Sequence, residues 1–245
     1  MIIFVNSNFI QMKKIILTFF VLLPLSTVFA ANYYCSPNGN GDGSFADPCS
    51  LTAGLAKTDL DTLFLRGGTY NLTATQRLNK NGTAQNRKAM FAYNDEKPIL
   101  DFRGQAYGNR GVQFAGSYLH VKGFVICHTG KNGFYNESNN SIFENCETYG
   151  NGDTGFQMKN CHGNLIVNCD SHDNFDYQNG DVSRADFGGN ADGFADKQYS
   201  DNGAPNIYDG CRAWGNSDDG WDFFDKTGNS IIRNSICFQN GPATY

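Results

Sequence analysis

A repeated phrase in the second half of the chain constrains the fold more than any other feature. The segments ENCETYGNGDTGF, VNCDSHDNF, DGCRAWGNSDDGW and RNSICFQNG align on Cys146, Cys169, Cys211 and Ser235, in steps of 23, 42 and 24 residues. The middle step corresponds to one repeat that carries an insertion, supplied by residues 176–189. A period in the low twenties, with short β-like runs between Gly and Asn turns, is typical of a parallel β-solenoid, in which each coil stacks on the next.

The same alignment predicts two further columns of similar residues. An asparagine stands five residues after each aligned position, at Asn151, Asn174, Asn216 and Asn240. An aromatic residue recurs in KNGF, DTGF, ADGF and DDGW, at Phe134, Phe156, Phe194 and Trp221. We expect the asparagines to hydrogen-bond from coil to coil and the rings to stack inside. We also expect buried thiols rather than disulfides at the six later cysteines, Cys127, Cys146, Cys161, Cys169, Cys211 and Cys237. An antiparallel sandwich, the alternative all-β class, does not explain columns in fixed register.

The preceding segments extend the same domain towards the N-terminus. Residues 61–72, 97–102 and 117–126 are apolar β-like runs that predict further strands. A chain of 245 residues can form one sizeable core, and we assign residues 31–245 to a single all-β domain, a parallel β-helix. Cys35 and Cys49 lie in a loop-like segment of an exported chain, so a disulfide between them is expected.

Residues 1–30 have the features of a secretory signal peptide. Two lysines precede an apolar run at residues 15–25, and the small residues at 26–30 suit signal-peptidase cleavage. The apolar run is too short for a membrane span. We expect Met12 to be the true start and the mature protein to be secreted.

Charge limits the classes of partner. The whole chain has a net charge of −5, and removal of residues 1–30 leaves 17 Lys and Arg against 24 Asp and Glu, a net charge of −7. An acidic protein is poorly suited to nucleic acid or to an anionic membrane surface. An anionic substrate would need a cation to bridge it to the protein. No feature predicts an oligomer, and a monomer is expected.

Four aspartates are expected to meet on the outer surface of the solenoid. Stacked coils lie about 4.8 Å apart, and aligning ADGFA with DDGWD places Asp192 beside Asp219. Asp218 belongs to the same turn, and Asp222 follows on the outward face of the next strand. Such a cluster is unfavourable without a partner. A hard divalent cation resolves the repulsion, and calcium fits best because it tolerates irregular oxygen geometry.

Asp196, on the strand that contains Phe194, is a carboxylate at a position predicted to face the interior. If Phe194 points inward, alternation directs Asp196 inward as well, which is costly for a carboxylate. We therefore expect a bend in the strand, or pairing of Asp196 with a neighbour such as Lys197.

The motifs in this region resemble those of a known family. NADGFADKQ, followed by GCRAWGNSDDGWDFFD, is similar to the family 9 polysaccharide lyases, the Pel9A-like pectate lyases, most strongly over residues 145–241. The resemblance implies a right-handed parallel β-helix that cleaves α-1,4-polygalacturonate by β-elimination. Asp192, Asp218, Asp219 and Asp222 match the calcium ligands of that family. Calcium there makes the C5 proton of the uronate more acidic, and a base removes it.

The chain also departs from the family pattern. The general base of the family is a lysine that would fall after Tyr245, so we expect a chain truncated at its C-terminus, with the last coils missing. Lys197 and Lys226 are the remaining candidates for a catalytic lysine, although contact with solvent or substrate suits each of them better. Lys197, Arg212 and Arg233 are candidates for binding uronate carboxylates.

Three classes of function remain open at this point. The first is a calcium-dependent lyase acting on polygalacturonate, or on rhamnogalacturonan or another uronate polymer. The second is a non-catalytic β-helix that binds calcium and polyuronate, favoured by the missing lysine. The third is a β-helical hydrolase, whose paired carboxylates would act with water and need no calcium.

Overall fold

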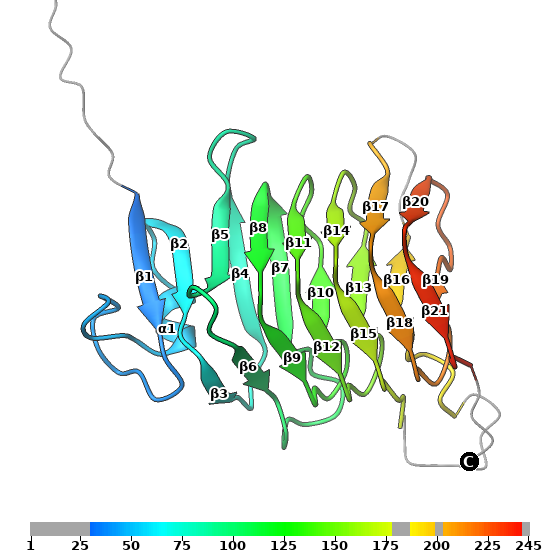
Figure 1. Cartoon of the computed structure of the whole chain (residues 1–245), viewed down its shortest axis with the longest axis horizontal. Coiled ribbons are helices and arrows are strands. Elements are labelled where there is room, and N and C mark those ends of the chain that lie inside the picture. Colours follow the sequence, from blue (N-terminus) through cyan, green and yellow to red (C-terminus); the bar gives the residue numbers. More distant parts are fainter. Residues whose placement is uncertain (1–29, 178–186, 199–202, 242–245) are drawn as a thin grey trace, which may run out of the picture.

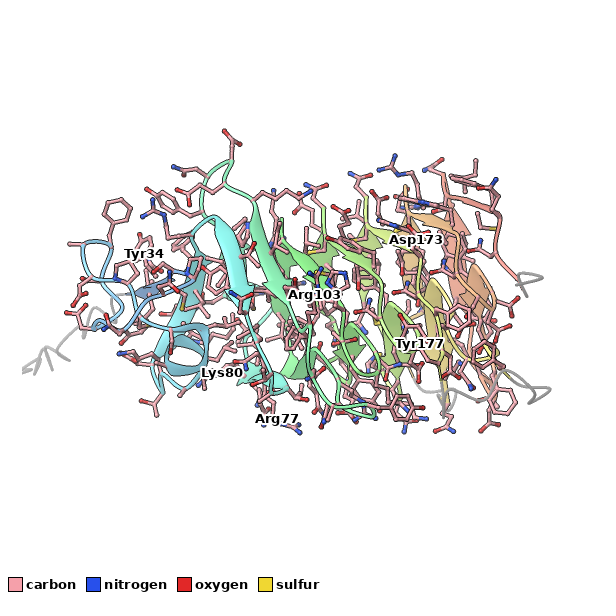
Figure 2. The ribbon with its side chains drawn as sticks, turned by 90° about the horizontal axis from the view of Figure 1, so that it is seen from below. Tyr34, Arg77, Lys80, Arg103, Asp173 and Tyr177 are labelled. Carbon is pink, nitrogen blue, oxygen red and sulfur yellow. The ribbon has the colours of Figure 1, made fainter. Side chains whose placement is uncertain are left out.

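The described part of the chain folds as a stack of parallel coils with a single short helix. The computed structural model describes residues 30–177, 187–198 and 203–241. Within these residues every strand pairing between named strands is parallel, and the strands form three sheets. Figure 1 shows the strands succeeding one another along the long axis, from β1 at one end to β21 at the other. The predicted parallel β-solenoid is confirmed.

The three sheets are named here by size. Sheet A has eight strands: β1 (Ala31–Cys35), β2 (Leu60–Leu65), β5 (Lys88–Ala92), β8 (Leu119–Lys122), β11 (Ile142–Glu144), β14 (Leu165–Val167), β17 (Asn206–Asp209) and β20 (Ser230–Arg233). Sheet B has seven: β3 (Gly68–Asn71), β6 (Pro98–Asp101), β9 (Val125–Cys127), β12 (Glu147–Tyr149), β15 (Asp170–His172), β18 (Arg212–Trp214) and β21 (Ile236–Phe238). Sheet C has six: β4 (Gln76–Asn81), β7 (Val112–Ser117), β10 (Phe134–Asn136), β13 (Phe156–Lys159), β16 (Phe194–Lys197) and β19 (Trp221–Asp222). Helix α1 (Leu51–Leu55) lies between β1 and β2 in the sequence and buries Leu51 and Leu55 in the core.

Each complete coil passes through sheets A, B and C in that order, and its corners explain the abundance of Asn and Gly. The bend from sheet A to sheet B has a positive φ at Asn145, Asn168, Gly210 and Asn234 in four successive coils. This left-handed conformation is open to Gly and is tolerated by Asn better than by most other residues. The turn chemistry therefore repeats with the same period as the strands.

The predicted interior columns are confirmed. The rings of Phe134, Phe156, Phe194 and Trp221 stack in sequence, with centroids 4.1, 5.2 and 4.9 Å apart. β15 pairs directly with β18, and β13 with β16, so the 42-residue step is one coil with an insertion. Of that insertion, residues 178–186 lie outside the described part of the chain, as do the expected signal peptide up to residue 29 and residues 242–245.

The asparagine column forms a continuous ladder of side-chain hydrogen bonds. The amide of Asn151 donates to Asn174, Asn174 donates to Asn216, and Asn216 donates to Asn240, at 2.7, 2.8 and 2.8 Å. Asn151, Asn174 and Asn216 are almost completely buried. Each buried asparagine amide thus forms hydrogen bonds with the asparagines of the coils on either side.

We expect Asn174→Ala to lower the free energy of unfolding by about 1–3 kcal/mol, because it removes the buried side-chain hydrogen bonds that Asn174 makes with Asn151 and Asn216. Urea unfolding followed by circular dichroism measures the loss. The exposed Asn109, whose amide reaches only the carbonyl of Ala106, provides a control that should change little as Asn109→Ala. Equal losses in the two variants would contradict a stabilising ladder.

The cysteines are thiols, and two expectations about them need correction. Cys146, Cys169 and Cys211 are buried in the interior column, as predicted. The expected Cys35–Cys49 disulfide is not formed: the two sulfurs face each other on paired segments but lie 3.7 Å apart, beyond the length of an S–S bond. Cys237, on β21, is exposed because no described coil packs over this last strand.

The described residues contain no helix with the length and apolar character that crossing a membrane requires.

Candidate functional site

The parallel register of β16 and β19 brings together the aspartates of two neighbouring coils. Ala195 pairs with Asp222, as predicted, and the amide of Gly193 donates to the carbonyl of Asp219 at 2.9 Å. The amide of Asp218 likewise donates to the carbonyl of Ala191 at 3.2 Å. The turn that enters sheet C therefore has the same path in both coils.

Three of the predicted carboxylates form a compact cluster. One oxygen each from Asp192, Asp218 and Asp219 lies within 4.8 Å of the others. Asp192 is fully buried, and its oxygens accept hydrogen bonds from the hydroxyl of Thr154 at 2.9 Å and from the amide of Asp219 at 3.3 Å. Asp218 is partly buried and Asp219 is exposed, so the cluster opens to solvent on one side. All of its donors are oxygens, which suits a hard divalent cation.

Burial makes this cluster electrostatically costly in the absence of a cation. It raises the pKa of Asp192 to about 7, assisted by the charges of Asp222 and Asp218, although Lys197 acts in the opposite direction. Burial also raises the pKa of Asp218, with contributions from Asp219 and Asp222. A cation bound between the oxygens would favour the charged carboxylates. The residues present therefore fit a metal ion by charge and donor type.

Asp222 occupies a different position from the other three aspartates. It makes an ion pair with Lys197, whose Nζ also lies 3.3 Å from Asp192 Oδ2. Burial alone would lower the pKa of Lys197, but Asp192 and Asp222 together raise it above its usual value. Lys197 is thus an ammonium group held between two of the four predicted metal ligands.

Lys226, the second candidate for a catalytic lysine, does not lie at this cluster. Its ammonium group is buried and lies 2.7 Å from Asp196, which is almost completely inaccessible. Asp196 points inward, as strand alternation requires, and also accepts hydrogen bonds from Ser230 at 2.6 Å and Asn206 at 3.1 Å. The expected pairing of Asp196 with Lys197 does not occur, because Lys197 faces outward on the same strand. Lys226 instead reaches Asp196 from the loop after β19.

The two candidate arginines lie on other faces of the solenoid. Arg212, on the outer face of sheet B, makes a two-point ion pair with Asp170. Arg233, on sheet A, pairs with Asp209 at 2.9 Å. The structure brings neither arginine together with the aspartate cluster of sheet C.

Sequence reasoning missed several residues beside the cluster. Thr154, from the preceding coil, holds Asp192, and Arg110 and Lys159 line a pocket that Lys197 shares. Lys159 could have been found, because it stands opposite Lys197 in the register that aligns Phe156 with Phe194. Arg110 belongs to no repeated phrase, so no comparable signal marked it.

Comparison with known proteins identifies the family to which this β-helix belongs. Residues 33–245 match the family model described as the Pel9A-like, right handed beta helix region. The chain belongs to this Pel9A-like family. The expected right-handed parallel β-helix is therefore confirmed.

Several Pel9A-like relatives are similar in sequence or structure. Pectate lyase L of Paenibacillus polymyxa (strain SC2) is 38% identical over 88% of this chain and 51% of its own length. Pectate lyase L of Dickeya chrysanthemi is 33% identical, over 85% of this chain and 51% of its own. The crystal structure of pectate lyase Pel9A superposes with a TM-score of 0.76 at 32% identity, over 89% of this chain and 57% of that one.

The chain spans about half the length of these two curated relatives. A rhamnogalacturonan lyase structure, at 24% identity and a TM-score of 0.70, shares the fold.

Proposed function

We propose that this Pel9A-like chain is a secreted, calcium-dependent pectate lyase that cleaves α-1,4-polygalacturonate by β-elimination. The observation that carries the proposal is the all-oxygen cluster of Asp192, Asp218 and Asp219 on the outer surface of a Pel9A-like β-helix. Relatives named pectate lyase, at 38% and 33% identity, support the same reaction and an acidic polysaccharide substrate. The signal-like residues 1–30 support secretion.

The cluster and its neighbours would each have a separate role in binding the cation and the substrate. Asp192, Asp218 and Asp219 would hold the calcium, with Asp222 beside them. Bound calcium would bridge the acidic protein to the uronate carboxylate and increase the acidity of the C5 proton. Thr154 keeps the Asp192 carboxylate in place through its hydroxyl. Lys197 supplies positive charge at the edge of the cluster, where a uronate carboxylate would lie.

The proton acceptor is a separate question. A general base must be unprotonated before it can take the C5 proton. In the calcium-free protein, Lys197 is held as an ammonium by two carboxylates, and Lys226 is buried against Asp196. Lys197 therefore suits substrate binding better than proton abstraction, and Lys226 suits neither. For the part of the chain that the structure describes, this arrangement favours, as the second candidate, a β-helix that binds calcium and polyuronate without cleaving it.

The ultraviolet absorbance of the unsaturated product distinguishes these functions. We expect the full chain to generate this product from polygalacturonate with calcium, and to stop when a chelator is added. A folded protein that binds calcium but yields no product would support the binding β-helix. Cleavage to saturated products that persists in chelator would instead indicate a hydrolase. Parallel assays on rhamnogalacturonan would show whether another uronate polymer is preferred.

A further inference from the structure

The outer face of sheet C has a basic pocket next to the aspartate cluster. The pocket has a volume of about 170 Å³, room for several water molecules. Four cationic side chains line it, those of Arg110, Lys131, Lys159 and Lys197, with Asp153 as the single acidic one. Such a concentration of positive charge is unusual in a chain whose net charge is −5.

Two of these cations are neutralised by nearby carboxylates and two are not. Lys131 pairs with Asp153 at 3.4 Å, and Lys197 pairs with the aspartates of the cluster. Among the described residues, neither Arg110 nor Lys159 makes a salt bridge with an acidic side chain. The pocket therefore contains two positive charges that form no salt bridge with a described residue.

Arg110 is held in place by an aromatic ring. Its guanidinium carbon lies 3.5 Å from the centre of the Tyr135 ring, a cation–π contact. Its Nε is buried and has no hydrogen-bond partner in the structure. A ligand that supplies an acceptor to the guanidinium group where it lines the pocket would therefore bind favourably.

Lys159 is crowded by other positive charges. It stands opposite Lys197 in the register between β13 and β16. Burial, and then the charges of Lys197 and Arg110, lower the pKa of Lys159, although the carboxylates of Asp225 and Glu137 act in the opposite direction. An anion in the pocket would relieve this repulsion.

We propose that Arg110 and Lys159 form a binding subsite for the carboxylate of a uronic acid residue, adjacent to the residue bound at the aspartate cluster. This assignment rests on the proposed function, because the occupant is a second residue of the same polyuronate. A carboxylate matches the forked donors of a guanidinium and accepts from an ammonium. A neutral sugar would leave both charges without a counter-ion.

The location of the subsite sets the direction of the polymer. Lys197 lines the pocket and also contacts Asp192, so the two binding positions adjoin. The pocket runs from that point across the coil of β13 and the coil that contains Lys131, towards the N-terminal end of the solenoid. The polyuronate therefore lies along the solenoid axis, over the outer face of sheet C.

Binding measured in the presence of a chelator tests the subsite separately from catalysis. We expect trigalacturonate to bind the full chain in isothermal titration calorimetry at low salt. Arg110→Gln and Lys159→Gln should each weaken that binding roughly tenfold, since each removes one charge-assisted hydrogen bond. Lys159→Arg, which keeps the charge, should retain binding. As a matched control, Lys122→Gln removes a lysine from the outer face of sheet A and should bind as the unmodified protein does.

The outcomes separate the subsite from the proposed function. If both Gln variants bind trigalacturonate as tightly as the unmodified protein, the subsite is excluded, even if the lyase assay succeeds. Equal binding of methyl-esterified trigalacturonate would exclude it too, because the ester has no carboxylate. Weaker binding by the Gln variants supports the subsite even if no unsaturated product forms. Should Arg110→Gln not fold, Lys159→Gln decides the question.

Discussion

Asp192→Asn should abolish the calcium-dependent activity of the proposed lyase and its stabilisation by calcium. Asp192 is the fully buried member of the cluster, and its two oxygens contact both the preceding coil, at Thr154, and the following one, at Asp219. Asparagine has nearly the same shape but carries no charge and offers a single oxygen. The fold should persist while the affinity for a divalent cation falls sharply.

The same substitution should remove a pH dependence from the calcium-free protein. The pKa of Asp192 is raised from 3.8 to about 7, chiefly by burial. Between these values the folded state retains a proton that the unfolded state has released, so stability decreases as pH rises from about 4 to 7. The shift corresponds to about 4 kcal/mol. In chelator above pH 7, Asp192→Asn should therefore be more stable than the unmodified protein.

Thermal unfolding with calcium and with chelator, at pH 4 and pH 8, measures both effects. Calcium should raise the melting temperature of the unmodified protein at pH 8 and leave that of Asp192→Asn unchanged. Asp95→Asn, at an exposed turn, removes the same charge away from the cluster and should respond to calcium normally. Full calcium stabilisation of Asp192→Asn would show that the ion binds elsewhere.

Lys226→Met should destabilise the protein by about 3–5 kcal/mol, because it leaves the carboxylate of Asp196 buried without its cation. Among the described residues, Asp196 would retain Ser230 and Asn206 as hydrogen-bond partners. Replacing both charges, as in Asp196→Leu with Lys226→Met, should recover much of the loss, since a buried pair of apolar side chains requires no compensation. Urea unfolding of the single and double variants measures the coupling between the two sites.

A surface ion pair supplies the comparison for this experiment. Lys97 pairs with Glu147 at 3.1 Å, but its side chain is 66% exposed. Lys97→Met should therefore change stability little, because solvent screens the pair. If Lys226→Met is as mild as Lys97→Met, the buried pair contributes no more than a surface contact and the interpretation is wrong.

The interior columns were predictable because the coils repeat. Backbone hydrogen bonds join each strand to its equivalents in the neighbouring coils, so one aligned residue sets the register of the rest. The alignment on Cys146, Cys169 and Cys211 was therefore sufficient to predict the asparagine ladder and the aromatic stack. It also predicted that Asp192 and Asp219 would be neighbours.

The contacts of individual side chains were less predictable than the backbone register, even within the repeat. Asp222 has the expected register opposite Ala195, yet it contacts Lys197 rather than completing the cluster with the other three aspartates. The register determines where a backbone position lies. It does not determine which of two opposite charges a flexible side chain will contact.

The sequence by itself determined the parallel solenoid, its columns and the position of the aspartate cluster, because these follow from a period that is visible along the chain. Only the tertiary structure decided that Lys226 enters the interior to meet Asp196, and that Arg110 comes beside Lys159. Lys226 and Arg110 lie in loops with no counterpart in the repeated phrases. The path of those loops through space determines which residues they contact, and local sequence patterns do not predict that path.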